Sequence, residues 1–159
     1  MPEPADVGDE PAPSGGADEA GMEPASILLV EDNPGDVKLT KKAFEKAALA
    51  NHIDVAADGV EAMTYLRDDG RDRPDIVLLD LKLPRMSGHE VLEEIKSDPD
   101  LRRIPVVILT SSESERDIVD SYDDHANAYL TKPVTFDGFR DVVERIEGFW
   151  FCVATLPPR

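Results

Sequence analysis

The chain has little of three things: cysteine, long apolar runs and positive charge. Its single cysteine, Cys152, cannot form an internal disulfide, which fits a reducing, cytoplasmic location. No apolar run approaches the roughly 20 residues that span a bilayer. The acidic N-terminus also lacks the basic and apolar segments of a secretory signal. We therefore expect a cytoplasmic protein that is neither exported nor inserted into a membrane.

The shortage of positive charge limits the classes of molecule that the protein is expected to bind. Asp and Glu number 34 against 17 Lys and Arg, which gives a net charge of -17. Nucleic acids and anionic membrane surfaces are bound by basic faces, so this balance argues against both. Dense surface acids are tolerated where salt screens their repulsion, which predicts a halophilic protein. An ordinary acidic protein is the simpler alternative.

The beginning of the chain differs in composition from the rest. Residues 1–24 contain seven acids, no Lys or Arg, and many Pro and Gly. Such a segment buries too little apolar surface to offset its chain entropy. We expect a disordered acidic leader over 1–24, one domain over 25–150 and a C-terminal extension over 151–159. A docking role for the leader is the alternative.

Short apolar runs alternate with stretches of helical periodicity after the leader. The apolar runs lie at residues 27–30, 53–57, 76–79, 106–109 and 126–130. The first, third and fourth are nearly continuous in Val, Ile and Leu, as in strands buried on both faces. The clearest helical stretch has Thr135 as a possible cap and these apolar positions: Phe136, Phe139, Val143, Ile146 and Trp150. The pattern predicts an α/β fold with a five-stranded parallel sheet and five helices on its two faces.

Polar side chains follow four of the predicted strands. Glu31 and Asp32 end the first strand, and Asp80 ends the third. Thr110 ends the fourth strand, and Lys132 follows the fifth. Binding sites in open parallel sheets form beyond the carboxyl ends of the strands. We therefore expect these five residues on one edge of the sheet.

Three carboxylates in one cleft require a counter-charge. Hard oxygen ligands suit Mg²⁺, so we expect Asp32 to bind it directly, Glu31 through water, and Asp80 to supply another oxygen. A carboxylate beside Mg²⁺ can also attack phosphorus and form an aspartyl phosphate. Lys132 would then bring a cation to one phosphate oxygen and the Thr110 hydroxyl a donor to another.

Local structure offers an alternative interpretation of the first acidic pair. Asn33 is a good N-cap and Pro34 suits the first helical position, so EDNPGD could serve only to start a helix. A cap requires one such residue, however, and not a pair of acids before it. Asp80, Thr110 and Lys132 could each be ordinary residues if taken alone. Their shared position at strand ends favours a site.

Four stretches resemble the receiver domain of two-component response regulators: ILLVEDN, PDIVLLDLKLPRMSGHEVLEEIK, IPVVILTSS and ANAYLTKP. The resemblance covers about residues 25–150 and implies a flavodoxin-like sheet in the order 2-1-3-4-5. It implies that Asp80 accepts a phosphoryl group from a sensor histidine kinase or phosphorelay protein. NPGDVKLT and IEGFW are similar to the single-domain regulators that partner bacterial phytochromes.

The resemblance also implies roles for individual residues. The main-chain carbonyl of Lys82 would complete the Mg²⁺ ligands, and Lys132 would contact the phosphate. Thr110 and Tyr129 occupy the switch positions. The implied protein is a switch that assists its own phosphorylation and dephosphorylation, and not an enzyme. His125 departs from the family, which commonly has Gly there at a positive φ.

The end of the chain points to a protein contact as the output. Nine residues follow Trp150, too few for a DNA-binding helix-turn-helix. Phe149, Phe151 and Val153 cannot all face the core, because neighbours on a helix point roughly 100° apart. The resulting apolar patch predicts a symmetric homodimer. A bend after Gly148 that folds these residues over the domain is the alternative.

Three other functions would suit part of this pattern. A phosphatase of the haloacid dehalogenase type requires Asp-x-Asp, and Lys82 stands where the second Asp would act. A flavodoxin-like carrier requires a Gly- or Ser/Thr-rich phosphate loop, which the first strand lacks. An adaptor with a relic site would not need Asp80, Thr110 and Lys132 together. We therefore predict a single-domain response regulator.

Overall fold

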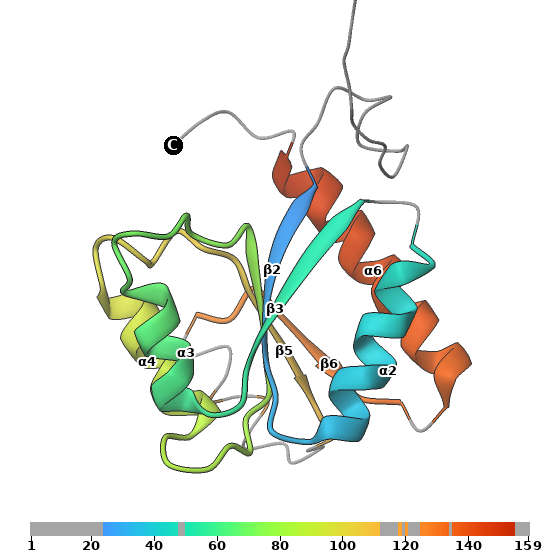
Figure 1. Cartoon of the computed structure of the whole chain (residues 1–159), viewed down its shortest axis with the longest axis horizontal. Helices are drawn as coiled ribbons and strands as arrows, with labels where there is room; N and C mark the ends of the chain where they lie inside the picture. The colour runs from blue at the N-terminus through green and yellow to red at the C-terminus, as the bar shows by residue number, and fades with distance from the viewer. Residues whose placement is uncertain are drawn as a thin grey trace, which may run out of the picture.

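The computed structural model places a parallel sheet between two layers of helices (Figure 1). It describes residues 24–47, 50–111, 118, 120, 125–133 and 135–154, with side chains as far as residue 148. The elements are β2 (Ala25–Val30), α2 (Pro34–Glu45), β3 (Asn51–Ala56), α3 (Gly59–Leu66), β4 (Ile76–Leu79), α4 (Gly88–Ser97), β5 (Val106–Thr110), β6 (Ala128–Thr131) and α6 (Phe136–Ala154).

The order of the five described strands is β3-β2-β4-β5-β6, and every pair is parallel. This is the flavodoxin-like order 2-1-3-4-5 that the family resemblance implied. Val30 pairs with Leu79, which brings the carboxyl ends of β2 and β4 level. Thr110 pairs with Thr131 at the ends of β5 and β6. The residues that follow these strands therefore leave the sheet at one edge.

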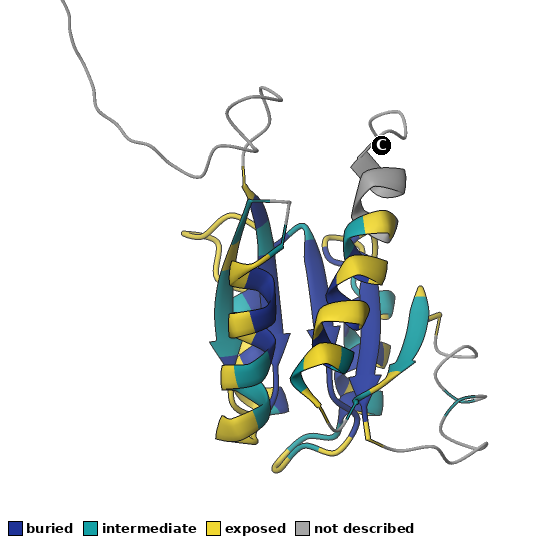
Figure 2. Ribbon diagram, turned by 90° about the vertical axis from the view of Figure 1, so that its right-hand side faces the viewer, coloured by how far each residue is buried: buried dark blue, intermediate teal, exposed yellow. Residues whose placement is uncertain are grey.

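The strands are apolar on both faces because helices cover both. Leu28 and Val30 of β2 point into one core with α3 and α4. Ile27 and Leu29 point into a second core with α2 and α6. Figure 2 shows the inner strands buried and the outward faces of the helices exposed. The nearly continuous Val, Ile and Leu runs are thus explained by two cores rather than one.

Two predicted helix starts are present. The Asn33 side chain accepts a hydrogen bond of 3.1 Å from the Asp36 N–H, and Pro34 occupies the first position of α2. The Thr135 hydroxyl accepts one of 3.1 Å from the Gly138 N–H at the start of α6. Both side chains satisfy amide groups that have no partner within the helix.

Some expectations fall wholly or partly on other residues. Four of the five expected helices have bounds within the described residues. The fifth, around residues 118–122, lies mostly outside them, and its described residues 118 and 120 are helical. The acidic leader lies outside them up to residue 23, as do the side chains of Phe149 and Phe151. The helix α6 continues past Gly148 to Ala154.

Two further sequence expectations concern backbone and membrane. His125 has a φ of 73°, the positive value expected where the family commonly has Gly. A non-glycine side chain in this region is strained, although less so for His than for most residues. Among the described residues, no helix is both long and apolar enough to cross a bilayer.

Candidate functional site

The side chains that follow the strands lie together at the carboxyl edge of the sheet. Glu31, Asp80 and Thr110 are buried, with exposed fractions of 3%, 6% and 0%. Asp32 is exposed at the mouth of the group. Carboxylate oxygens of Glu31, Asp32 and Asp80 lie within 4.8 Å of one another. The edge thus combines a buried interior with one acid that is open to solvent.

Asp80 is held through both carboxylate oxygens. Its Oδ1 accepts hydrogen bonds from the Thr110 hydroxyl at 2.8 Å and from the Lys82 N–H at 3.1 Å. Its Oδ2 accepts one from the Lys132 ammonium at 2.8 Å. Neutral donors therefore fix one oxygen, and a cation neutralises the other.

Lys132 contacts three carboxylates at once. Its Nζ lies 2.8 Å from Asp80, 3.0 Å from Asp36, and in contact with Glu31. The Lys132 side chain is only 7% exposed. One ammonium shared by three acids leaves a net negative charge in the cluster.

Asp36 is the site residue that the sequence interpretation missed. It belongs to the first turn of α2, and 96 positions separate it from Lys132. The available signal was its place in EDNPGD, on the helix that begins at the site. An acid in a first helical turn is common for reasons of the helix dipole, so the signal is weak.

Charge compensation sets the ionisation of Asp80 and Lys132. Burial opposes ionisation of Asp80, but the donors Lys132, Lys82 and Thr110 outweigh it and hold the pKa of Asp80 below its ordinary value. Burial likewise opposes the charge of Lys132, but its three carboxylate partners raise the pKa of Lys132 above its ordinary value. Both groups are therefore charged at neutral pH.

Glu31 is compensated less well. Burial, together with the negative charge of Asp80, raises the pKa of Glu31 to about 7, although Lys132 and the Asn33 N–H act in the opposite direction. A buried carboxylate of this kind is stabilised by a further cation. Three oxygen donors within 4.8 Å, one of them exposed, fit a hard divalent cation that keeps several waters. Glu31, Asp32 and Asp80 could therefore hold such a metal.

The backbone that follows Asp80 packs closely against the start of α4. A Cβ on Gly88 would lie 2.2 Å from the Asp80 carbonyl oxygen, so only glycine allows α4 to begin here. The Gly88 N–H donates to the Leu81 carbonyl at 2.9 Å. Arg85, with a φ of 66°, places its Nε 3.0 Å from the Asp58 carboxylate and ties this loop to the start of α3. The backbone after Asp80 is thus held on two sides.

Tyr129 takes a different position from the other predicted residues. It pairs with Ile108 in the sheet and packs, half-buried, against the core shared with α3 and α4. Thr110 lies two residues beyond Ile108 on β5, and its hydroxyl points to Asp80. Coupling between Thr110 and Tyr129 stays a prediction, as does metal binding by the Lys82 carbonyl.

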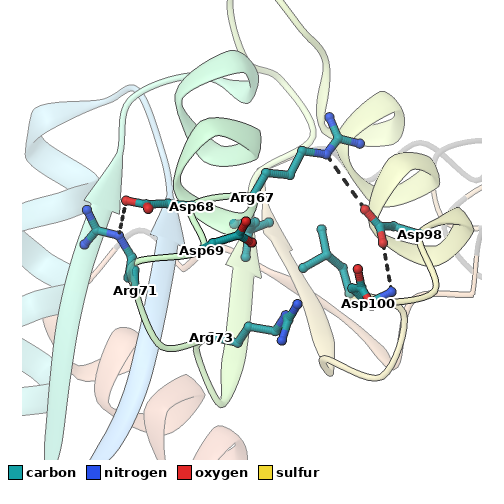
Figure 3. Close-up of a pocket in the computed structure, with 9 residues that line it drawn as sticks. Arg67, Asp68, Asp69, Arg71, Arg73, Asp98 and Asp100 are labelled. Atoms are coloured by element: carbon teal, nitrogen blue, oxygen red, sulfur yellow. Dashed lines mark hydrogen bonds and ion pairs between the residues drawn. The ribbon is translucent and has the colours of Figure 1, made fainter.

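A separate hollow of about 150 Å³ lies between the end of α3 and the end of α4 (Figure 3). It is lined by these residues: Leu66, Arg67, Asp68, Asp69, Arg71, Arg73, Asp98, Asp100 and Leu101. Arg71 pairs with Asp68, and Arg67 approaches Asp98 (Figure 3). This hollow shares no residue with the carboxylate cluster, and its charges partly neutralise one another.

Known proteins are similar to this chain in sequence. Residues 27–144 match the response regulator receiver domain family. Response regulator Rcp1 of Synechocystis sp. is 43% identical over 138 residues, which cover 84% of this chain and 94% of that protein. The probable methanogenesis regulatory protein FilR2 of Methanothrix harundinacea is 45% identical over 131 residues, 80% of this chain and 84% of that one.

Solved structures agree with these matches. The phosphorylated cyanobacterial phytochrome response regulator RcpA is 46% identical, with a TM-score of 0.78 over 86% of this chain and 100% of that one. The Mn²⁺-bound form of response regulator Rcp1 is 42% identical, with a TM-score of 0.77 over 85% of this chain and 100% of that one. The chain is thus similar along most of its length to single-domain regulators.

Proposed function

The chain belongs to the response regulator receiver domain family of two-component signalling, and from this premise we propose that Asp80 accepts a phosphoryl group. The donor is a sensor histidine kinase or a phosphorelay protein. RcpA is a phytochrome response regulator, so a phytochrome-type histidine kinase is the first donor to test. The signal then passes to a partner by protein–protein contact.

The surroundings of Asp80 carry this proposal. Transfer forms a bond between an Asp80 oxygen and phosphorus, while the bond from phosphorus to the donor's histidine nitrogen breaks. The Asp80 carboxylate is ionised and oriented by Thr110 and Lys82. Lys132, which contacts Asp80 at 2.8 Å, is placed to neutralise an oxygen of the incoming phosphoryl group.

The carboxylate cluster supports Mg²⁺ as the cofactor. Glu31, Asp32, Asp80 and the main-chain carbonyl of Lys82 would hold it, with Asp32 as a direct ligand and Glu31 acting through water. When bound, the metal would neutralise charge on the transferring group. The Mn²⁺-bound form of the relative Rcp1 favours a divalent cation here.

Asp36 has a distinct part in this arrangement because it contacts Lys132 without belonging to the metal cluster. A cation bound by Glu31 and Asp80 reduces their hold on the Lys132 ammonium. Asp36 would then keep that ammonium charged and near Asp80, while one of its three protons turns to the phosphoryl group.

Phosphorylation of a single residue tests the proposal. Incubation with acetyl phosphate or phosphoramidate and Mg²⁺ should add one phosphoryl group, measured by intact mass. Asp80→Asn should abolish the addition. Asp69→Asn removes an exposed carboxylate in the loop after α3, outside the carboxylate cluster, and should leave the phosphoryl addition unchanged. Continued labelling of the Asp80→Asn variant would show that another residue is the acceptor.

We propose that Thr110 and Tyr129 transmit the change. Phosphate on Asp80 would draw the Thr110 hydroxyl inward and free space for the Tyr129 ring, which favours one of two packings. The NMR chemical shifts of the isotope-labelled Tyr129 ring should change on phosphorylation of the wild type. Thr110→Val should accept phosphate without that shift, whereas the control Thr64→Val on exposed α3 should retain it. A normal shift in Thr110→Val would contradict the coupling.

We also propose a symmetric homodimer through α6 and the extension that follows it. The helical backbone continues past Gly148 to Ala154, which supports a longer contact helix. Phe149 or Phe151 would lie at the centre of the interface. Light scattering at moderate and high salt should show a dimer, and Phe149→Asp with Phe151→Asp should give a monomer that still takes phosphate. A wild type that stays monomeric in both phosphorylation states would rule out this interface.

A further inference from the structure

Four of the chain's seven lysines lie within nine positions, on α2 and the residue that ends it. They are Lys38, Lys41, Lys42 and Lys46, and all four are exposed. Their spacing of three, four and eight residues places them on one side of the helix. The opposite side packs on the sheet through Thr40, Ala43 and Phe44. We call the four lysines the lysine face.

The lysine face has no carboxylate partner within the part of the chain that the structure describes. None of its four ammonium groups is in an ion pair there, and the one recorded contact is Lys42 over the Phe136 ring at 5.5 Å. Several other cations do pair, as Lys132, Arg67 and Arg85 show. The chain has twice as many acids as bases, and four neighbouring lysines that have no ion pair among the described residues can bind an acidic segment.

The leader has the complementary charge and the right point of attachment. Residues 1–23 hold seven acids and no Lys or Arg. They join the domain before β2, where the Ala25 N–H donates to the Ala50 carbonyl at 3.0 Å, and Ala25 pairs with Asn51. Ala50 and Asn51 close the connection that follows Lys46, so β2 begins at the same edge of the sheet at which α2 ends (Figure 1).

The leader is also long enough. Twelve residues of α2 span about 18 Å at 1.5 Å per residue. Twenty-three residues reach at most about 80 Å when extended. Attachment to the same chain gives a millimolar effective concentration, so individually weak surface ion pairs can act together.

We propose that the acidic leader docks on the lysine face and covers α2. The contact is electrostatic and many-sided, and salt should weaken it because the Debye length falls from about 10 Å at 0.1 M to about 3 Å at 1 M.

Paramagnetic relaxation in the full chain tests the docking. A nitroxide is placed in the leader through Ser14→Cys, with Cys152→Ser to keep a single label. At about 0.1 M salt, the amide signals of α2 should lose intensity relative to those of α4. The loss should disappear at about 1 M salt. If the amide signals of α2 kept their full intensity at the lower salt concentration, the proposal would be overturned.

Charge variants separate docking from chance proximity. Replacing all four residues of the lysine face by Gln should abolish the intensity loss, with the other amide signals unchanged as evidence of folding. A matched variant removes four exposed cations elsewhere and should retain the loss: Arg67→Gln, Arg71→Gln, Arg73→Gln and Arg102→Gln. Broadening that survives the lysine variant would overturn the proposal. The proposal would also be overturned if the intensity loss arose only between molecules, in a mixture of spin-labelled chains and unlabelled chains. The leader of a second copy would then occupy the lysine face.

Discussion

The clearest perturbation of the site is Lys132→Met, which keeps the length of the side chain and removes its charge. The Lys132 side chain is 7% exposed and lies against the side chains of Asp80 and Glu31, which are 7% and 3% exposed. Loss of the ammonium leaves two buried carboxylates without a positive charge between them. Asp80 then keeps its hydrogen bonds from the Thr110 hydroxyl and the Lys82 N–H. Glu31 keeps one hydrogen bond, from the Asn33 N–H. The metal-free protein should therefore become much less stable at pH 8.

The size of the loss follows from burial. Removing one partner of a buried ion pair costs about 3–5 kcal/mol, because an uncompensated charge remains. With a urea m-value of about 2 kcal/mol per molar, the unfolding midpoint should fall by roughly 2 M. Protonation limits the penalty, since the pKa of Glu31 is already about 7 and rises further without Lys132. The deficit should thus shrink when the pH is lowered to 5.5.

Urea unfolding in the presence of a chelator measures this at both pH values. Mg²⁺ added without the chelator should also narrow the gap, because a divalent cation replaces the missing positive charge. Arg102→Met removes a positive charge from an exposed position outside the lysine face and should shift stability by no more than about 0.5 kcal/mol. Equal midpoints for wild type and Lys132→Met at pH 8, or an undiminished deficit at pH 5.5, would refute the reasoning.

Four further outcomes are expected. The pKa of Glu31 is raised to about 7 from its ordinary 4.5, so the contribution of Glu31 to metal-free stability is largest below about pH 4.5 and falls by on the order of 3 kcal/mol as the pH rises to 7. Glu31→Gln should flatten urea midpoints across that window, where the lowered pKa of Asp80 has no effect. Calorimetric titration with Mg²⁺ should show a larger loss of affinity for Asp32→Asn than for Glu31→Gln, and equal affinity in wild type and Asp32→Asn would remove the metal assignment. Gly88→Ala should cost about 1–3 kcal/mol in urea unfolding, because its Cβ meets the Asp80 backbone. His125→Gly should raise the free energy of unfolding by about 1 kcal/mol by relieving its positive φ, and an unchanged midpoint would show that no strain is stored there.

Much of the fold could be predicted because the burial of strands and helices requires apolar residues at regular spacings in the sequence. Continuous apolar runs indicated strands covered on both faces, and alternate residues of β2 do enter two cores. The places of Glu31, Asp80 and Lys132 followed from the same logic, since residues that end parallel strands emerge at one edge. The strand order came from resemblance to a family, because periodicity alone does not say which strands are neighbours.

Other features depend on distances between elements, which no local pattern encodes. Asp36 meets Lys132 across 96 positions, and nothing in EDNPGD distinguishes that contact from an ordinary helix start. Gly88 is required because α4 begins against the Asp80 backbone. The sequence determined which side chains could reach the edge of the sheet. Only the tertiary structure decided that one ammonium serves three carboxylates, because charge balance in a buried site depends on separations of a few ångströms.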